Sequence, residues 1–335
     1  MSVTIVGGGF WGDEGKGKVV AYLALADRPP VVARAGVGPN AGHTILMDGR
    51  KVVMRQLPVG YVHRGARLLI GAGVLVDPEV TLAEIDRLDV DPARLGIDPL
   101  CTIIESAHVV DDRGRDHLRE VVGTTGTGTG PANEARAARR ARLARDEPLL
   151  AGLLADVSAE VNGAIDAGDA VLIEGTQGFG LSLYHGDYPF VTSKDTTAAA
   201  FCMDVGVGPT RIDEVVLVFK AFASRVGEGP FPTELPRELA AARGWEEFGA
   251  VTGRPRRIGE FDFERASRAI MVNGATQLAL TNLDRRFPDA AGLERLEALP
   301  TEARRFVDEV EARLRRPVTL VSTGPEVRAM IDRRG

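Results

Sequence analysis

Apolar positions along the chain fall into short runs that alternate with longer stretches of helical spacing. The short runs are rich in β-branched residues and bounded by turn residues, which is typical of buried strands. Strands are predicted at residues 3–6, 31–34, 67–70, 74–75, 170–174, 214–222, 277–281 and 318–321. Helices are predicted at residues 80–88, 134–154 and 300–316, and a further one begins near Val19.

This alternation indicates an α/β fold with a mostly parallel central sheet and flanking helices. Several strands end in polar loops, so ligands are expected at the carboxyl edge of the sheet. A chain of 335 residues can bury a large core, and no internal repeat or clear boundary divides it. Residues 1–335 are therefore expected to form a single domain.

The loop between the first strand and the first helix carries the clearest chemical signal. Residues 12–18 (GDEGKGK) fit the pattern G-x-x-x-x-G-K. Its glycines let backbone N–H groups turn towards oxyanions in front of a helix N-terminus, which predicts a P-loop-like phosphate loop. Val19 stands where a P-loop has Ser or Thr, and Asp13 lies inside the loop. A carboxylate beside phosphates is unfavourable unless it binds a metal or does chemistry.

The alternative for this loop is a flexible glycine turn with solvated charges. Lysine usage argues against that alternative, because the chain has only five lysines and two of them, Lys16 and Lys18, fall in this loop.

Overall composition excludes several classes of partner. The net charge of −6 argues against nucleic acid as the main partner. Cys101 and Cys202 are too few for a disulfide framework or a zinc site, which favours a reducing cytoplasm. No apolar run is long enough to span a bilayer, so no membrane partner is expected and the location is predicted to be cytoplasmic.

A histidine offers a partner for Asp13. His43 lies in the small-residue segment 39–44, where a ligand can approach the backbone closely. Asp13 and His43 would form an acid/base pair on neighbouring strand ends. The loop 123–130 alternates glycine with threonine and is either a linker or a loop that wraps a phosphate. The other isolated histidines are expected to have structural roles: His63, His108 and His117.

Nine segments, in order and along nearly the whole chain, resemble the adenylosuccinate synthetase family of purine nucleotide synthesis. They are residues 11–18 (WGDEGKGK), 40–44 (NAGHT), 123–126 (GTTG) with 130–131, 174–178 (EGTQG), 185–193 (HGDYPFVTS), 225–235 (RVGEGPFPTEL), 247–257 (EFGAVTGRPRR), 281–284 (TNLD) and 322–325 (STGP). Any one of these segments is weak evidence for the family, but nine of them in the family's order are strong evidence. The chain is shorter than the common bacterial form and resembles the compact form of archaea and some phages.

The resemblance implies a ligase that joins IMP and L-aspartate at the expense of GTP. The γ-phosphoryl group first activates purine O6, and the aspartate amine then displaces phosphate at C6. By this matching, Asp13 is the base for purine N1 and His43 is the acid that stabilises charge on the phosphoryl group and O6. Lys16 is the third residue expected in catalysis. Mg²⁺ would be held by Asp13 and the Gly42 carbonyl, with phosphates supplying other oxygens.

The same matching assigns the ligand contacts. GTP would meet Gly12, Asp13, Glu14, Gly15, Lys16, Gly17, Lys18, Gly42, His43, Thr44, Arg256, Asn282, Leu283, Asp284, Ser322, Thr323 and Gly324. IMP would meet Asp13, Asn40, Ala41, Gly42, His43, Thr125, Gln177, Thr192, Arg254 and, from the second subunit of a homodimer, Arg139. Aspartate would meet Ala250, Val251, Thr252, Gly253, Arg254 and Arg256.

Two of these assignments have a direct chemical reason. Asp284 can accept hydrogen bonds from guanine N1–H and N2–H₂. Arg254 and Arg256 supply the fork-shaped donors that suit a dicarboxylate. In isolation, the arginine-rich segment 254–257 would be interpreted as a solvated charge run.

Four positions depart from the family pattern. Val251 replaces a threonine, Pro255 stiffens the aspartate loop, Thr127 replaces an arginine, and Asn282 replaces the lysine before the guanine-reading aspartate. The first three bear on ligand affinity, and Asn282 bears on the preference for GTP over ATP.

Three alternative functions stay open at this stage. One is the related phage synthetase that acts on dGMP, with either GTP or ATP as the energy donor; that branch loses the loop aspartate, whereas this chain keeps Asp13. A second is a paralogue acting on another purine nucleotide. The third is a P-loop GTPase switch or binding module, which would not need His43 or the arginines of segment 254–257.

Overall fold

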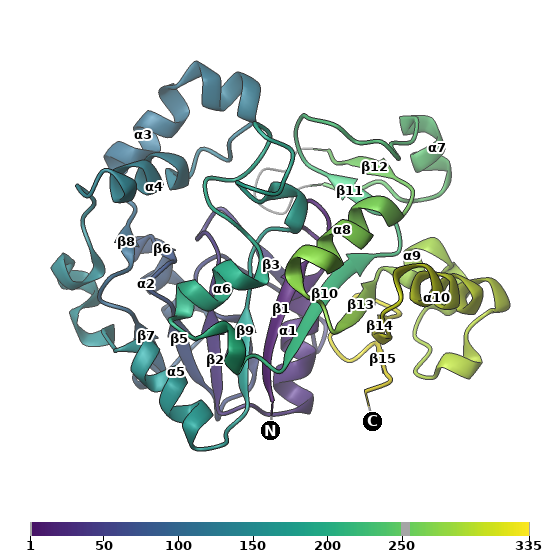
Figure 1. The fold of residues 1–335 in the computed structure, drawn as a ribbon, viewed down its shortest axis with the longest axis horizontal. Coiled ribbons are helices and arrows are strands. Elements are labelled where there is room, and N and C mark those ends of the chain that lie inside the picture. Colours follow the sequence, from purple (N-terminus) through teal and green to yellow (C-terminus); the bar gives the residue numbers. More distant parts are fainter. Residues whose placement is uncertain (1, 249–254, 335) are drawn as a thin grey trace.

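The computed structural model describes residues 2–248 and 255–334, and a nine-stranded sheet runs through this part of the chain (Figure 1). The strand order is β15-β14-β13-β10-β1-β9-β2-β5-β7. Only the edge strand β15 runs antiparallel to its neighbour, so the mostly parallel sheet is confirmed. The strands are β1 (Val3–Gly8), β2 (Val31–Arg34), β5 (Arg67–Ile70), β7 (Leu95–Ile97), β9 (Val171–Glu174), β10 (Glu214–Lys220), β13 (Gln277–Thr281), β14 (Val318–Ser322) and β15 (Met330–Asp332).

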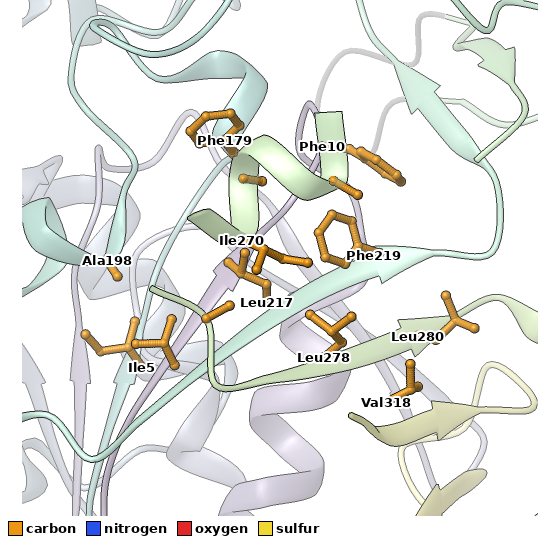
Figure 2. Close-up of a cluster of buried hydrophobic side chains, with 14 of the residues drawn as sticks. Ile5, Phe10, Phe179, Ala198, Leu217, Phe219, Ile270, Leu278, Leu280 and Val318 are labelled. Atoms are coloured by element: carbon orange, nitrogen blue, oxygen red, sulfur yellow. The ribbon is translucent and has the colours of Figure 1, made fainter. Parts of the chain in front are cut away.

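Successive side chains of the central strands enter two different hydrophobic cores. Ile5 and Leu217 belong to the core on one face of the sheet, whereas Val6 and Val216 belong to the core on the other. This follows from the alternation of side chains along a strand. Figure 2 shows the first core, in which Ile5 and Leu217 lie near Ile270 of α8 (Phe263–Asn273). Because both faces are buried, the strands are nearly continuous apolar runs in the sequence.

Helices cover both faces of the sheet (Figure 1). The helix after the phosphate loop is α1, and the predictions at residues 80–88 and 300–316 correspond to α2 and α10. The remaining bounds are α1 (Lys16–Ala26), α2 (Pro78–Arg87), α3 (Ser106–Gly114), α4 (Thr129–Ala137), α5 (Val157–Asp166), α6 (Ala198–Val205), α7 (Arg237–Ala242), α9 (Leu283–Arg286) and α10 (Thr301–Leu314). None of the helices in the described residues is long and apolar enough to cross a membrane.

The prediction of one helix over residues 134–154 is wrong. Helix α4 ends at Ala137, and Arg139 adopts the left-handed conformation with φ 61°. The Arg140 N–H then closes the turn onto Ala135 O at 3.0 Å. Beyond it the backbone bonds to the segment around β8 (Thr102–Ile103) instead of continuing the helix, since Ala144 N donates to Cys101 O. Short 3₁₀ turns at Ala144–Asp146 and Pro148–Leu153 complete the segment.

Three two-stranded sheets lie outside the main sheet. One is a hairpin of β3 (His43–Met47) and β4 (Arg50–Met54), which run antiparallel. The strand predicted at 74–75 is β6 (Leu75–Val76), which pairs with β8 in a small sheet. The strand predicted at 214–222 ends at Lys220, and β11 (Ala223–Arg225) pairs separately with β12 (Arg257–Gly259).

Candidate active site

A cavity of about 480 Å³ opens at the carboxyl ends of β1, β9 and β2. The loops that follow these three strands reach it, as expected for a parallel sheet. Predicted site residues that line it are Gly12, Asp13, Gly15, Lys16, Gly17, Asn40, Ala41, Gly42, His43, Thr44, Thr125, Gln177, Thr192 and Arg256. Segments separated by more than two hundred positions in the sequence are therefore brought to one site.

The phosphate loop is held in shape from within by Glu14. Its Oε1 accepts hydrogen bonds from the backbone N–H groups of Phe10 (3.0 Å) and Gly12 (2.8 Å), and its Oε2 pairs with Lys16 Nζ at 2.7 Å. Glu14 is 1% exposed and does not line the cavity. Its side chain therefore shapes the loop, while the loop glycines and Lys16 face the cavity.

Asp13 occupies an unusual backbone position in this loop. Its φ is 60°, in the left-handed region that non-glycine residues rarely adopt. Such conformations persist where the surrounding structure requires them, often at functional sites. The carboxylate is 30% exposed and pairs with Arg256, whose Nη2 lies 2.9 Å from Asp13 Oδ2.

Arg256 is in turn held by Glu247. Arg256 Nη1 lies 2.7 Å from Glu247 Oε2, and the same carboxylate pairs with Lys220 at the end of β10. Burial would raise the pKa of Glu247, but Lys220 and Arg256 lower it to about 2. Glu247 Oε1 also accepts a hydrogen bond from Asn282 Nδ2 at 3.3 Å. Asn282 stands where the family pattern has a lysine. The Glu247 carboxylate that Asn282 contacts is paired with a different ammonium group, that of Lys220.

His43 begins β3 and lies against the first turn of α1. A Cβ added at Gly17 would come within 2.9 Å of His43 Cβ, so glycine allows this close approach. His43 Nδ1 contacts Glu174 Oε1 at 2.5 Å, and Arg34 Nη1 lies 3.1 Å from Nδ1. Burial and Arg34 lower the pKa of His43, and Glu174 opposes them.

Polar residues on neighbouring loops line the opposite part of the cavity. Gln177 Nε2 donates to Asn40 Oδ1 at 2.9 Å, and Asn40 Nδ2 contacts Thr192 Oγ1 at 3.4 Å. Thr125 lines the cavity, and its hydroxyl lies 2.9 Å from that of Thr127. The glycine-threonine loop therefore reaches the site and is not a linker.

The residues expected to hold the guanine base form a separate group. They follow β13 and β14 and do not line the cavity: Asn282, Leu283, Asp284, Ser322, Thr323 and Gly324. Lys18 joins this group and not the cavity wall, since its Nζ donates to Ser322 Oγ at 2.6 Å and to Ala329 O at 2.8 Å. Burial raises the pKa of Asp284. Lys18 thus ties the first helix to the loop after β14.

One further predicted residue lies away from this cavity. Arg139 lies in the turn after α4 and does not line it, so a role at this site requires a second subunit. Ala250, Val251, Thr252, Gly253 and Arg254 lie outside the described residues.

Other cavity-lining residues were missed by the sequence interpretation. Trp11, Tyr188, Phe190 and Val191 belong to quoted segments but were given no role, and His117 was expected to be structural. The other unassigned residues of the cavity wall are Asp112, Leu118, Val122, Gly123, Thr124, Thr129, Gly130, Leu181, Leu183, Pro189, Ser193, Val226 and Glu228. Only their position within the motif-bearing segments could have indicated some of them.

Trp11 anchors one wall through a partly buried carboxylate, that of Asp187. Its Nε1 donates to Asp187 Oδ2 at 2.7 Å, and Arg225 and Arg265 each pair with Asp187 at 2.7 Å. Both guanidinium groups also lie over the Trp11 ring, with centroid distances of 5.2 and 4.3 Å. The segment that carries Tyr188 and Phe190 is therefore fastened directly beside the phosphate loop.

The model of one protein family, described as adenylosuccinate synthetase, matches residues 5–147 and 142–286. The chain belongs to the adenylosuccinate synthetase family. Adenylosuccinate synthetases from Archaeoglobus fulgidus and Pyrococcus horikoshii are 56% and 54% identical to it, over 100% of this chain and 99% of theirs. These archaeal relatives have nearly the same length, which confirms the expected compact form.

Two solved structures resemble the fold of this family member. A fully ligated adenylosuccinate synthetase from Plasmodium falciparum superposes with a TM-score of 0.92 at 23% identity, covering 99% of this chain and 100% of the other. A succinoaminodeoxyadenylate synthetase of cyanophage S-2L, bound to dGMP and dATP as an energy donor, superposes with a TM-score of 0.81 at 27% identity. This match covers 100% of this chain and 96% of the other. The family assignment therefore rests on the sequence comparisons, and the likeness to the Plasmodium falciparum structure supports the fold.

Proposed function

We propose that this protein joins IMP and L-aspartate to form adenylosuccinate, with hydrolysis of GTP and a 6-phosphoryl-IMP intermediate. The observation that carries the proposal is the meeting of Asp13, His43 and the phosphate-loop glycines in one cavity. A phosphoryl group cradled by the loop would lie next to both a carboxylate and an imidazole, which is what phosphoryl transfer to a deprotonated purine oxygen requires.

In this mechanism, Asp13 removes the proton from purine N1 and O6 becomes nucleophilic. For this step His43 carries a proton on each ring nitrogen and donates from Nε2 towards the phosphoryl oxygens and O6, where negative charge develops. Lys16, 3% exposed at the cavity wall, adds a fixed positive charge beside the phosphates. The amine of the L-aspartate substrate then displaces phosphate at C6. Arg256 and segment 250–254 would hold the two carboxylates of this substrate.

The donors also suit Mg²⁺. Asp13 and Gly42 both line the cavity, where the Asp13 carboxylate and the Gly42 carbonyl would supply oxygen ligands, and the Asp13 carboxylate already faces a cation, the Arg256 guanidinium. When bound there, Mg²⁺ would neutralise phosphate charge during transfer.

The remaining ligand contacts follow from the family. Asn40, Ala41, Thr125, Gln177 and Thr192 would hold IMP. Thr44 would contact the triphosphate, and the group of residues after β13 and β14 would hold its base. Arg139 would come from the second subunit of a homodimer.

The discriminating experiment is a product assay with GTP, IMP and L-aspartate, repeated with dGMP for IMP and with ATP for GTP. We expect adenylosuccinate from the first mixture and little product from dGMP. The full-length 56% identity to a protein named adenylosuccinate synthetase, against 27% for the dGMP-bound phage protein, favours this outcome. Turnover of dGMP but not of IMP would overturn the proposal.

A further inference from the structure

One fully buried carboxylate beside the cavity has no part in the proposed chemistry. Glu174 ends β9, and both it and Arg34 of β2 have 0% of their side chains exposed. Glu174 Oε2 accepts a hydrogen bond from the Val59 N–H at 2.7 Å. Its Oε1 meets two groups at once, the Arg34 guanidinium and His43 Nδ1.

These contacts decide which nitrogen of His43 carries a proton. A carboxylate only accepts hydrogen bonds, so the contact with Glu174 Oε1 at 2.5 Å requires a proton on His43 Nδ1. Arg34 Nη1 lies farther from Nδ1, at 3.1 Å, and already has Glu174 Oε1 as its acceptor. Although burial would raise the pKa of Glu174, Arg34 and His43 hold it below its usual range, so Glu174 remains an acceptor.

The other ring nitrogen, Nε2, makes no such contact among the described residues. His43 Nε2 is buried and has no hydrogen-bond partner among the residues that the structure describes. His43 itself lines the cavity, as do Lys16 and Asp13. Leaving a buried polar atom without a partner is unfavourable, so its retention points to a ligand atom as its partner.

We propose that Glu174 is a positioning residue that acts through His43: it fixes the proton on Nδ1 and leaves Nε2 as the nitrogen that meets the reacting group. This rests on the proposed function only in naming that group as the transferring phosphoryl and O6. Arg34 keeps Glu174 charged and, because it can only donate, would bind the bare Nδ1 lone pair if the carboxylate were lost. The pair thus selects one of two tautomers.

The tautomer can be read directly from the parent protein without substrates. ¹⁵N-labelled histidine distinguishes a protonated from an unprotonated ring nitrogen by NMR, and the His43→Asn spectrum assigns the signals of His43. We expect Nδ1 of His43 to be protonated. A neutral ring with its proton on Nε2 would overturn the inference, whatever the activity of the enzyme.

Glu174→Gln tests whether this carboxylate is the cause. Glutamine has no charge to hold Arg34, and its NH₂ group can itself donate to Nδ1, so the proton should move to Nε2. We expect kcat to fall by about 10²–10⁴-fold, the usual contribution of a positioned acid or base, with the KM values for IMP and GTP nearly unchanged. An unchanged tautomer or an unchanged kcat would contradict the proposal.

Glu84→Gln is the matched control. Glu84 is also a buried carboxylate, 5% exposed, and it accepts hydrogen bonds from the backbone of Arg55, Gln56 and Leu57 without contacting His43. It should keep the parent tautomer, so loss of the tautomer in both variants would indicate general damage and overturn a specific role for Glu174. If Glu174→Gln does not fold, the parent spectrum still decides the tautomer. A parent that makes no adenylosuccinate would overturn the proposed function but not this reading of His43.

Discussion

The Arg256 guanidinium joins Asp13 to Glu247, with one nitrogen 2.9 Å from the Asp13 carboxylate and another 2.7 Å from Glu247. A residue of the phosphate loop is thereby tied to a segment 243 positions later in the chain. Arg256 is 10% exposed and lines the cavity, so its charge acts on the site in a partly desolvated setting. The proposed base Asp13, the expected aspartate-binding Arg256 and Glu247 form one connected unit.

Asp13→Asn should abolish most of the activity while the protein remains folded. Asparagine tolerates the left-handed backbone at φ 60° but cannot take the purine N1 proton. We expect kcat to fall by at least about 10²-fold, the lower end for loss of a general base. Asp48→Asn is the control, since Asp48 has φ 51° in a hairpin turn away from the cavity. Substantial residual activity in Asp13→Asn would mean that another group is the base.

Arg256→Ala should raise the KM for L-aspartate more than it changes the affinity for IMP. Loss of charge-assisted hydrogen bonds to a carboxylate costs about 1.5–3 kcal/mol, or roughly ten- to a hundredfold. The neighbouring Arg257 pairs with Glu234 and does not line the cavity, so Arg257→Ala is the control. Steady-state kinetics with aspartate as the varied substrate measure both variants. Equal effects of the two substitutions would argue against an aspartate contact.

Asp284→Asn should reduce the preference for GTP over ATP. The carboxylate would accept hydrogen bonds from guanine N1–H and N2–H₂, whereas adenine N1 would face it with a lone pair. An unpaired polar group of this kind costs about 1–3 kcal/mol, or roughly ten- to a hundredfold in selectivity. The measurement is kcat/KM for each triphosphate, with Asp289→Asn at an exposed position as the control. A parent that prefers ATP would contradict the guanine assignment.

Subunit mixing tests the proposed contribution of Arg139 in trans. Inactive Asp13→Asn and inactive Arg139→Ala subunits should regain activity when they exchange, because one site of each mixed dimer then has both residues. Arg140→Ala, which changes an exposed neighbour, should be active by itself. Absence of recovery after demonstrated exchange would exclude a shared site.

Acid stability should depend on Glu247. Its pKa is lowered from 4.5 to about 2, so between these values the unfolded state binds more protons than the folded state. The stabilisation that the ionised Glu247 side chain gives to the folded state is therefore complete above pH 4.5, and it is lost as the pH falls towards 2. Glu247→Gln should make the free energy of unfolding less dependent on pH in this window, as measured by urea titration at several pH values. Glu246→Gln, at the exposed neighbouring position, should retain the parent slope.

The sequence alone was sufficient for those parts of the protein that local chemistry specifies. Strands such as 3–6 and 277–281 could be predicted because a strand buried on both faces must be apolar throughout. Asp13 and His43 could be selected because each lies in a short motif beside a strand end, and the structure brings both to the cavity. The family assignment, confirmed by the relatives, also depended on short motifs in a fixed order.

Only the tertiary structure decided which partners these residues have. The Arg34–Glu174 pair joins positions 140 apart, and no local pattern distinguishes a buried ion pair from two solvated charges. Helix α4 likewise ends early because backbone groups after Ala137 find partners near β8, although the sequence continues with good helix formers. Lys18 fits the phosphate motif yet bonds to the loop after β14, because the packing of α1 directs its side chain there. Motif spacing specifies the residue types near a strand end, whereas burial and long-range hydrogen bonds determine what each side chain contacts.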